Sequence, residues 1–202
     1  MTSPFAVMKL APVVPVLVIE DAAYARPIAE ALVAGGLFAL EVTLRTAAAL
    51  EVIAEMAKVQ GAVVGAGTVL NEADLRASID AGAQFIVSPG LTEPLGKAAI
   101  ASGIPFLPGI ANAGDIMRGL DLGLSHFKFF PAEASGGIKA LKAITGPFGQ
   151  CKFCPTGGIT QASAPDWLAL EAVLCVGGSW IVPPGAPDVA AITEAARKAA
   201  AL

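Results

Sequence analysis

The residue with the clearest chemical potential is Lys128, which lies in the apolar run His126–Pro131 (HFKFFP). Successive side chains of a β-strand point to opposite faces, so Lys128 shares a face with His126 and Phe130. A strand this apolar is expected to be covered on both sides by helices, which would bury the lysine. Burial disfavours the ammonium form, and enzymes use it to lower lysine pKa values to roughly 7–8, where the free amine attacks carbonyls and forms Schiff bases. The alternative is a lysine that reaches solvent at the strand end or pairs with a carboxylate.

A second group of chemically active residues lies in Leu40–Thr46 (LEVTLRT). Alternation along this predicted strand places Glu41 and Thr43 on the inward face, opposite its apolar face. A carboxylate near the interior must be paired or have a raised pKa, and a raised pKa would let Glu41 act as a general acid/base. A structural partnership with Lys128 or Arg45 is the alternative, and the two roles are compatible. Arg45 can bind a carboxylate or phosphate through two parallel hydrogen bonds, or be a solvated loop residue.

Glycine-rich turns follow several other predicted strands. In Gly65–Thr68 (GAGT), the glycines would let the backbone approach a ligand and Thr68 would supply a hydroxyl. Pro155–Ile159 (PTGGI) and Val176–Trp180 (VGGSW) each carry a glycine pair. Many barrel enzymes bind a phosphate group at this place, because glycine leaves backbone N–H groups free to point at an anion. Plain turns are the alternative.

The elements that must position these residues alternate along the whole chain, strand before helix. The predicted strands are Val13–Ile19, Leu37–Leu44, Val63–Thr68, Phe85–Ser88, Pro105–Pro108, the lysine strand, Lys152–Pro155 and Val173–Val176. The predicted helices are 22–34, 47–59, 72–81, 92–102, 113–122, 137–143, 165–170 and 188–202, with Asp21 and Asn71 as N-caps. Eight such units without a composition break predict an α/β fold of the (β/α)8 TIM barrel type, a single domain over residues 1–202 with a short N-terminal lead-in. An open doubly wound sheet is the alternative, but Ile19-Glu20-Asp21 stands where its glycine-rich fingerprint would fall.

Composition excludes several classes of partner. Hydrophobic residues make up 55% of the chain and charged residues 15%, with a net charge of −4 and no basic stripe, so we expect no nucleic-acid partner. The apolar runs are too short to span a bilayer and the N-terminus does not resemble a signal peptide, so we expect a cytoplasmic protein without a membrane. Cys151 and Cys154 have neither a second cysteine pair nor more than one histidine to complete a metal site, so we interpret them as structural.

The longer motifs together resemble a known family. LEVTLRT (40–46), VGAGTVL (64–70), IVSPGLT (86–92), FKFFPAE (127–133), FCPTGGI (153–159) and CVGGSW (175–180) resemble the bacterial 2-dehydro-3-deoxy-phosphogluconate aldolases, which also cleave 4-hydroxy-2-oxoglutarate. The resemblance covers nearly the whole chain, and the motif positions show no departure. It implies a class I aldolase on a (β/α)8 barrel, a homotrimer, a place in the Entner–Doudoroff route, and no metal or organic cofactor.

The resemblance also implies roles for individual residues. Lys128 would form the Schiff base with the substrate keto carbon, and Glu41, directly or through a water, would move the protons. Arg45 and Thr68 would hold the pyruvate end of the substrate. The residues implied to shape the pocket are Pro89 and Phe130, and those implied to bind phosphate are Gly157, Gly158, Gly178 and Ser179. The products would be pyruvate and glyceraldehyde 3-phosphate.

Two other functions stay open on the sequence. One is a different phosphosugar barrel enzyme, such as an isomerase, in which Lys128 acts only as a charge. The other is an engineered or assembly-forming trimeric barrel scaffold. The charge-poor stretches Ala47–Leu50 and Ala199–Leu202 motivate it, because helix faces with little charge can be contact surfaces.

Overall fold

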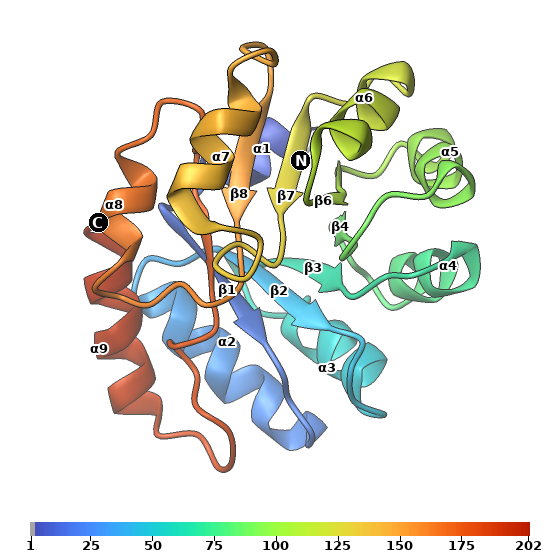
Figure 1. Cartoon of the computed structure of the whole chain (residues 1–202). Helices are drawn as coiled ribbons and strands as arrows, with labels where there is room; N and C mark the ends of the chain where they lie inside the picture. The colour runs from blue at the N-terminus through green and yellow to red at the C-terminus, as the bar shows by residue number, and fades with distance from the viewer. Residues whose placement is uncertain (1–2) are drawn as a thin grey trace.

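The computed structural model describes residues 3–202 as an alternation of parallel strands and helices (Figure 1). The strands are β1 (Val13–Leu17), β2 (Ala39–Thr43), β3 (Val63–Gly67), β4 (Phe85–Val87), β5 (Phe106–Leu107), β6 (Gly109–Ile110), β7 (His126–Phe129), β8 (Lys152–Pro155) and β9 (Val176–Gly178). The helices are α1 (Pro4–Met8), a 3-10 turn η1 (Ala22–Tyr24), α2 (Ala25–Ala34), α3 (Ala49–Met56), α4 (Glu72–Asp80), α5 (Glu93–Ser102), α6 (Ala113–Asp121), α7 (Gly137–Thr145), α8 (Ala164–Leu168) and α9 (Val189–Ala200).

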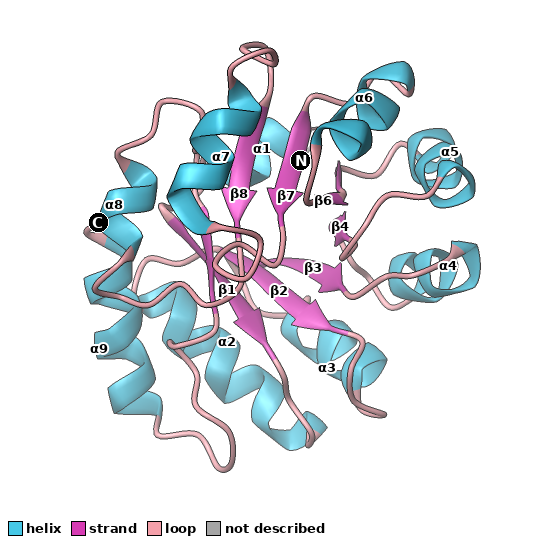
Figure 2. Ribbon diagram, viewed as in Figure 1, coloured by secondary structure: helices cyan, strands magenta, loops and turns pink. Residues whose placement is uncertain are grey.

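The strands form two parallel sheets. A curled six-stranded sheet has the order β5-β4-β3-β2-β1-β9, and a three-stranded sheet has the order β6-β7-β8. Isolated bridges Phe153↔Val173 and Thr156↔Gly177 connect the β8 and β9 segments. In Figure 2 the strands lie around a common centre and the helices lie outside them. The predicted α/β class is therefore confirmed, with parallel strands whose carboxyl ends gather on one side.

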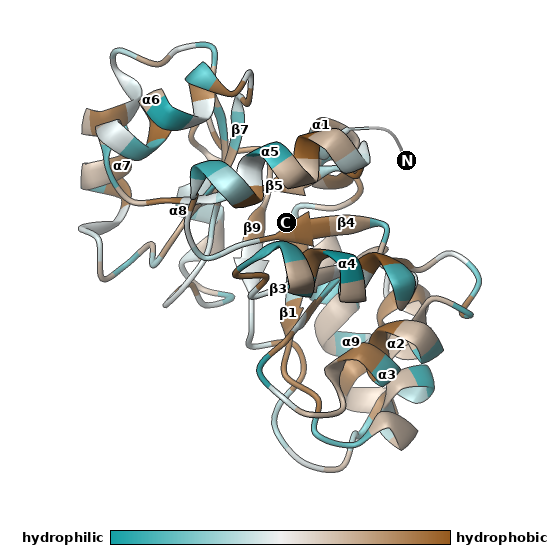
Figure 3. Cartoon of the chain, turned by 90° about the vertical axis from the view of Figure 1, so that its right-hand side faces the viewer, coloured by the Kyte–Doolittle hydropathy of each residue, from teal (hydrophilic) through white to brown (hydrophobic). Residues whose placement is uncertain are grey.

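Apolar side chains fill both sides of the strands. Phe127 and Phe129 pack outward against the helices with no exposed surface, and β1 and β4 are among the most hydrophobic segments in Figure 3. A smaller inner cluster lies at the N-terminal ends of the strands, where α1 covers them. Its buried members are Val7, Met8, Val14, Ala39, Phe85, Val87, Leu107, Cys154 and Cys175.

Most predicted elements are observed, and three predictions need correction. The fifth strand, predicted as Pro105–Pro108, is two short strands on either side of Pro108, because proline has no N–H to donate to a sheet. The eighth strand begins at Val176, not Val173. Leu174 N donates to Phe153 O whereas Val176 N donates to Pro12 O, so the segment changes neighbour before β9 starts. The N-terminal lead-in contains a helix, α1, which was not predicted.

The predicted caps are confirmed. Asp21 Oδ1 accepts from Ala23 N at 2.9 Å and begins η1, from which α2 continues. Asn71 Oδ1 accepts from Asp74 N at 2.9 Å, while Asp74 Oδ2 accepts from Leu70 N at 3.0 Å. The reciprocal bond of this capping box therefore falls one residue before the cap.

Between residues 3 and 202, no helix has the length and apolar character needed to cross a membrane.

Candidate active site

Side chains from distant parts of the sequence meet in one pocket at the carboxyl ends of the strands. It has a volume of about 160 Å³. Its lining includes every side chain predicted for catalysis, for pyruvate binding or for pocket shape: Glu41, Arg45, Thr68, Pro89, Lys128 and Phe130. Val16, Thr43 and Thr156 complete the lining.

Lys128 and Glu41 form a buried ion pair in this pocket. Lys128 Nζ donates to Glu41 Oε1 at 2.8 Å, and the two side chains expose 7% and 4% of their surface. The Phe130 ring centroid lies 5.3 Å from the same Nζ, within cation–π range. Because an unpaired buried charge is costly, each of the two charged groups stabilises the burial of the other. The geometry is compatible with both roles left open for Glu41, as partner of the lysine and as proton carrier.

The position of Glu41 depends on a glycine, Gly67, that has no side chain to compete for the same space. Gly67 lies on the adjacent strand β3, and a Cβ built there would collide with Glu41 Oε1 and Cγ. The carboxylate therefore occupies space that any other residue at position 67 would fill. The glycine of the GAGT turn serves here as room for an acidic side chain.

Thr43 is a pocket residue to which the sequence assigned no function. Its hydroxyl donates to Leu17 O at 2.9 Å, and Arg45 Nε donates to that hydroxyl oxygen at 3.2 Å. Because the hydroxyl proton is used by Leu17, Thr43 acts toward the arginine as an acceptor. Nε is thereby engaged, which leaves the terminal Nη groups of Arg45 for an anionic ligand. In the sequence, the only sign of a role for Thr43 was its predicted inward position on β2.

Thr68 has an unusual backbone conformation. Its φ is +61°, the only positive value of a non-glycine residue between residues 3 and 202. The left-handed region is unfavourable for a β-branched residue and costs on the order of 1–3 kcal/mol. Such strain persists where the surroundings hold it, often at ligand sites, and Thr68 lines the pocket.

The predicted phosphate residues lie beside this pocket, outside its lining. Gly157 and Gly158 follow β8 with φ values of +105° and +81°, conformations that favour glycine. Gly178 ends β9, and Ser179 after it is exposed. The bridge between Thr156 and Gly177 holds the two glycine pairs next to each other. The structure thus brings together two turns that are distant in sequence.

Thr156 and Val16 are further pocket residues that the sequence analysis missed. Thr156 is buried, and its N–H donates to Phe129 O at 2.9 Å, which joins the end of β8 to the lysine strand. Alternation along Lys152–Pro155 places Thr156 on the same face as Cys154, so the signal was present in the FCPTGGI motif. Val16 is the apolar residue that β1 pairs with Glu41.

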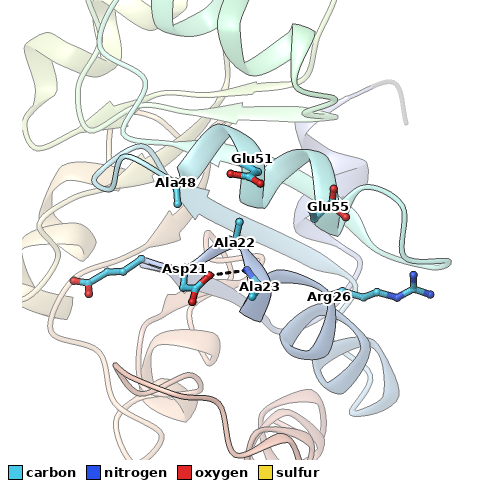
Figure 4. Close-up of a pocket in the computed structure, with 8 residues that line it drawn as sticks. Asp21, Ala22, Ala23, Arg26, Ala48, Glu51 and Glu55 are labelled. Atoms are coloured by element: carbon cyan, nitrogen blue, oxygen red, sulfur yellow. Dashed lines mark hydrogen bonds between the residues drawn. The ribbon is translucent and has the colours of Figure 1, made fainter.

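A larger hollow than the lysine pocket lies elsewhere on the surface. Its volume is about 790 Å³, and it lies between the start of α2 and α3, with Glu51 and Glu55 on one side and Asp21 and Arg26 on the other (Figure 4). It shares no residue with the lysine pocket. Arg26 is engaged with Glu30 on the solvent side, Nε to Oε1 at 2.8 Å. The charged side chains that line this hollow are solvated and include no lysine, so we do not assign the amine chemistry to it.

The three cysteines are free thiols, and all are buried. A hydrogen bond with Cys154 and burial raise the pKa of Cys175, and burial raises that of Cys151. Thiols of high pKa are poor nucleophiles and poor metal ligands. Within residues 3–202, no cluster of three histidine, cysteine or acidic residues is arranged to hold a metal ion.

A buried lysine–carboxylate pair at the carboxyl ends of parallel strands is typical of α/β enzymes that work through a lysine amine. Comparison with known proteins identifies the family. The model of the KDPG and KHG aldolase family matches residues 5–195. The 2-dehydro-3-deoxy-phosphogluconate aldolase of Zymomonas mobilis is 64% identical over 195 residues, 96% of this chain and 94% of its own.

Two solved structures are also similar. The 2-keto-3-deoxy-6-phosphogluconate aldolase of Zymomonas mobilis with 3-phosphoglycerate has a TM-score of 0.97 and 62% identity, and the match covers 100% of this chain and 96% of that one. The Legionella pneumophila KDPG aldolase, with pyruvate captured as a covalent carbinolamine, has a TM-score of 0.95 and 46% identity, with 98% of both chains covered. The chain belongs to the KDPG and KHG aldolase family and is an aldolase, a carbon–carbon lyase.

Proposed function

We propose that this chain is a class I aldolase that cleaves 2-dehydro-3-deoxy-6-phosphogluconate to pyruvate and glyceraldehyde 3-phosphate. The observation that carries the proposal is the buried Lys128–Glu41 pair in a pocket that also contains Arg45 and Thr68. The covalent pyruvate carbinolamine of the Legionella pneumophila relative supports Schiff-base chemistry in the family.

In the proposed mechanism, a proton of Lys128 passes to Glu41 and the free amine attacks the C2 carbonyl of the substrate. Glu41 then gives this proton to the carbinolamine hydroxyl, which leaves as water, so that a protonated imine able to accept an electron pair forms and Glu41 is again a carboxylate. Glu41, directly or through one water, removes the proton of the C4 hydroxyl. The C3–C4 bond then breaks, and its electrons form the pyruvate enamine while the aldehyde leaves. Protonation of the enamine at C3 and hydrolysis of the imine release pyruvate and restore the lysine.

The other pocket residues have binding roles in this proposal. Arg45 and Thr68 hold the carboxylate of the pyruvate end, and Pro89 and Phe130 shape the wall around it. At the far end of the substrate, the phosphate is bound by the following residues: Gly157, Gly158, Gly178 and Ser179. Gly157 and Gly158 at positive φ and the exposed Ser179 are suited to this, because their backbone N–H groups can turn toward an anion. The 3-phosphoglycerate in the Zymomonas mobilis structure supports a phosphorylated three-carbon ligand.

The proposal extends to the architecture. β5 and β6 would be two halves of one strand, since β5 pairs with β4 and β6 pairs with β7 on either side of Pro108. The bridges between the β8 and β9 segments would close the ring. The two sheets would then form one (β/α)8 barrel, a single domain over residues 1–202.

The remaining assignments rest on the family resemblance. We propose a cytoplasmic homotrimer that acts in the Entner–Doudoroff route, also cleaves 4-hydroxy-2-oxoglutarate, and needs no cofactor. The assembly alternative is separable by light scattering, because a particle larger than a trimer would favour the scaffold interpretation. The exposed Leu50 and Leu202 belong to the charge-poor stretches that motivate it.

Borohydride reduction in the presence of pyruvate, followed by intact and peptide mass spectrometry, tests the central step. We expect a reduced pyruvate adduct on the peptide that contains Lys128, and none in Lys128→Ala. A folded wild-type protein without the adduct would refute the Schiff base and favour an isomerase in which the lysine is only a charge.

A further inference from the structure

Glu133 belongs to the FKFFPAE motif but has no assigned role. It lies in the loop after the lysine strand, and this loop is hydrogen-bonded to the loop after β8. Ala132 N donates to Thr156 O at 2.8 Å, and Glu133 N donates to Gly157 O at 3.1 Å. Glu133 therefore lies directly beside the glycine pair of the proposed phosphate site.

The side chain of Glu133 covers Gly158. A Cβ built on Gly158 would lie 2.8 Å from both Cβ and Cγ of Glu133, closer than real side chains come. The stem of the glutamate thus packs on the bare backbone of this glycine, whose φ is +81°. The Gly157–Gly158 loop packs directly against the Glu133 stem, and a side chain at position 158 would push the loop and the stem apart.

The far end of Glu133 is bound to a buried indole. Trp167 Nε1 donates to Glu133 Oε1 at 3.1 Å, although Trp167 on α8 has no exposed surface. The indole itself is packed against Phe129 of the lysine strand, with ring centroids 6.2 Å apart. A buried indole N–H that lost this acceptor would be left without a partner, which is costly. One carboxylate therefore connects the loop after β7, the glycine loop and α8.

The charge of Glu133 argues against direct contact with the phosphate. A carboxylate beside an anion site opposes binding through repulsion, so its presence there calls for a geometric reason. We propose that Glu133 is a positioning residue: by bridging to Trp167 across Gly158, it holds the Gly157–Gly158 loop in the conformation that binds the substrate phosphate. This inference rests on the proposed phosphate site.

Kinetics on two substrates tests the role. The substrates are 2-dehydro-3-deoxy-6-phosphogluconate and the same compound without its phosphate. In Glu133→Ala we expect the KM for the phosphorylated substrate to rise about tenfold, because a loosened loop loses the orientation of its N–H groups, and the preference in kcat/KM for that substrate to fall by the same factor. Glu133→Gln keeps an acceptor for the indole and should retain most of the preference. Asp166→Ala removes a neighbouring exposed carboxylate on α8 and serves as the control for charge.

Three results would overturn the positioning role. They are an equal loss on both substrates, no loss in Glu133→Ala, or the same loss in Glu133→Gln as in Glu133→Ala. The last would mean that charge, not the bridge, matters.

A binding measurement separates this inference from the proposed function. Inorganic phosphate is titrated while the backbone amide resonances of Gly157 and Gly158 are followed by NMR. We expect these amides to respond in the wild-type protein, with weaker binding in Glu133→Ala and near-normal binding in Glu133→Gln. A wild-type response that Glu133→Ala leaves unchanged would refute the positioning role alone. Absence of any response in the wild type would refute the phosphate site and the positioning role together.

Discussion

The two ends of the strands use the same alternation of side chains for opposite purposes. At the carboxyl ends, the inward residues include Glu41, Thr43 and Lys128, all buried, around a pocket of about 160 Å³. At the N-terminal ends, the inner cluster is apolar and α1 covers it, which leaves a cavity of about 10 Å³. The difference indicates that one end is built for chemistry and the other for stability. Substitutions at the two ends should therefore separate catalysis from folding.

The largest effect is expected from Glu41→Gln at the carboxyl ends. The amide can still accept a hydrogen bond from Lys128 but cannot carry the proton, so kcat should fall by about 10²–10⁴-fold. Steady-state kinetics measures the loss, and circular dichroism checks that the fold is retained. A kcat close to that of the wild type would remove Glu41 from the proton transfers.

A matched pair on β3 tests the comparison within one strand. Gly67 leaves room for Glu41, whereas Gly65, two residues earlier, is covered by the ring of Phe85. Gly67→Ala should displace the carboxylate and lower kcat by about 10²-fold. Gly65→Ala should overpack the inner cluster and cost about 1–3 kcal/mol of unfolding free energy, with kcat retained in the folded fraction. Thermal unfolding and steady-state kinetics are measured on both variants. Equal effects of the two substitutions on kcat and on stability would contradict the separation of catalysis from folding between the two ends of the strands.

A smaller effect is expected from Thr43→Val. Loss of the hydroxyl that orients Arg45 removes a hydrogen bond to a charged group, and KM for pyruvate in the condensation direction should rise about 10- to 100-fold. The kcat should change less, because Lys128 and Glu41 keep their contact. Thr43→Ser retains the hydroxyl and should restore most of the affinity. If Thr43→Ser loses affinity to the same extent as Thr43→Val, the hydroxyl by itself does not account for the orientation of Arg45.

The smallest effect is a pH dependence at the N-terminal ends. Burial, with a smaller contribution from Lys152, lowers the pKa of His126 below its usual 6.5, and the ring also contacts Phe5 of α1. Between the folded and unfolded pKa values of His126, the unfolded chain binds more protons than the folded one. The contribution of His126 to stability is therefore fully present above pH 6.5 and declines as the pH falls below this value.

Replacement by a group that does not titrate tests this effect. Thermal unfolding of His126→Asn should depend less on pH between about 5 and 6.5 than that of the wild type. An unchanged pH profile would mean that other groups dominate this range.

The carboxyl-end residues were predictable because their types are rare in apolar strands. A lysine or glutamate inside a run of hydrophobic residues stands out, and period-two alternation assigns its face. Thr43 and Thr156 were missed because threonine is common in strands of any kind. The Thr43 hydroxyl is directed by Leu17 O, and the backbone N–H of Thr156 is held by Phe129 O, and both partners are distant in sequence.

The boundaries of helices and strands were likewise predictable where the signal is local and not where it depends on distant residues. Caps such as Asn71 were predictable because the signal is local to a few residues. The start of β9 at Val176 was not, because it depends on which neighbouring strand the segment pairs with at each residue. Helix α1 was missed because it is short, and its stability comes from packing Val7 and Met8 on the strand ends.

The pairing of β1 with β9 has a consequence for synthesis of the chain. On the ribosome, β1 can find β2 early, but its other edge has no partner until Val176–Gly178 has emerged. Helix α9 emerges later still, and Ala196 must fit against Gly35, where there is no space for a Cβ. Nascent chains therefore carry an open, apolar strand edge for most of their translation, the kind of edge that pairs with other chains. Premature termination before β9 should yield aggregation-prone products that lack half of the proposed phosphate site, so cells should depend on chaperones or proteolysis to clear them.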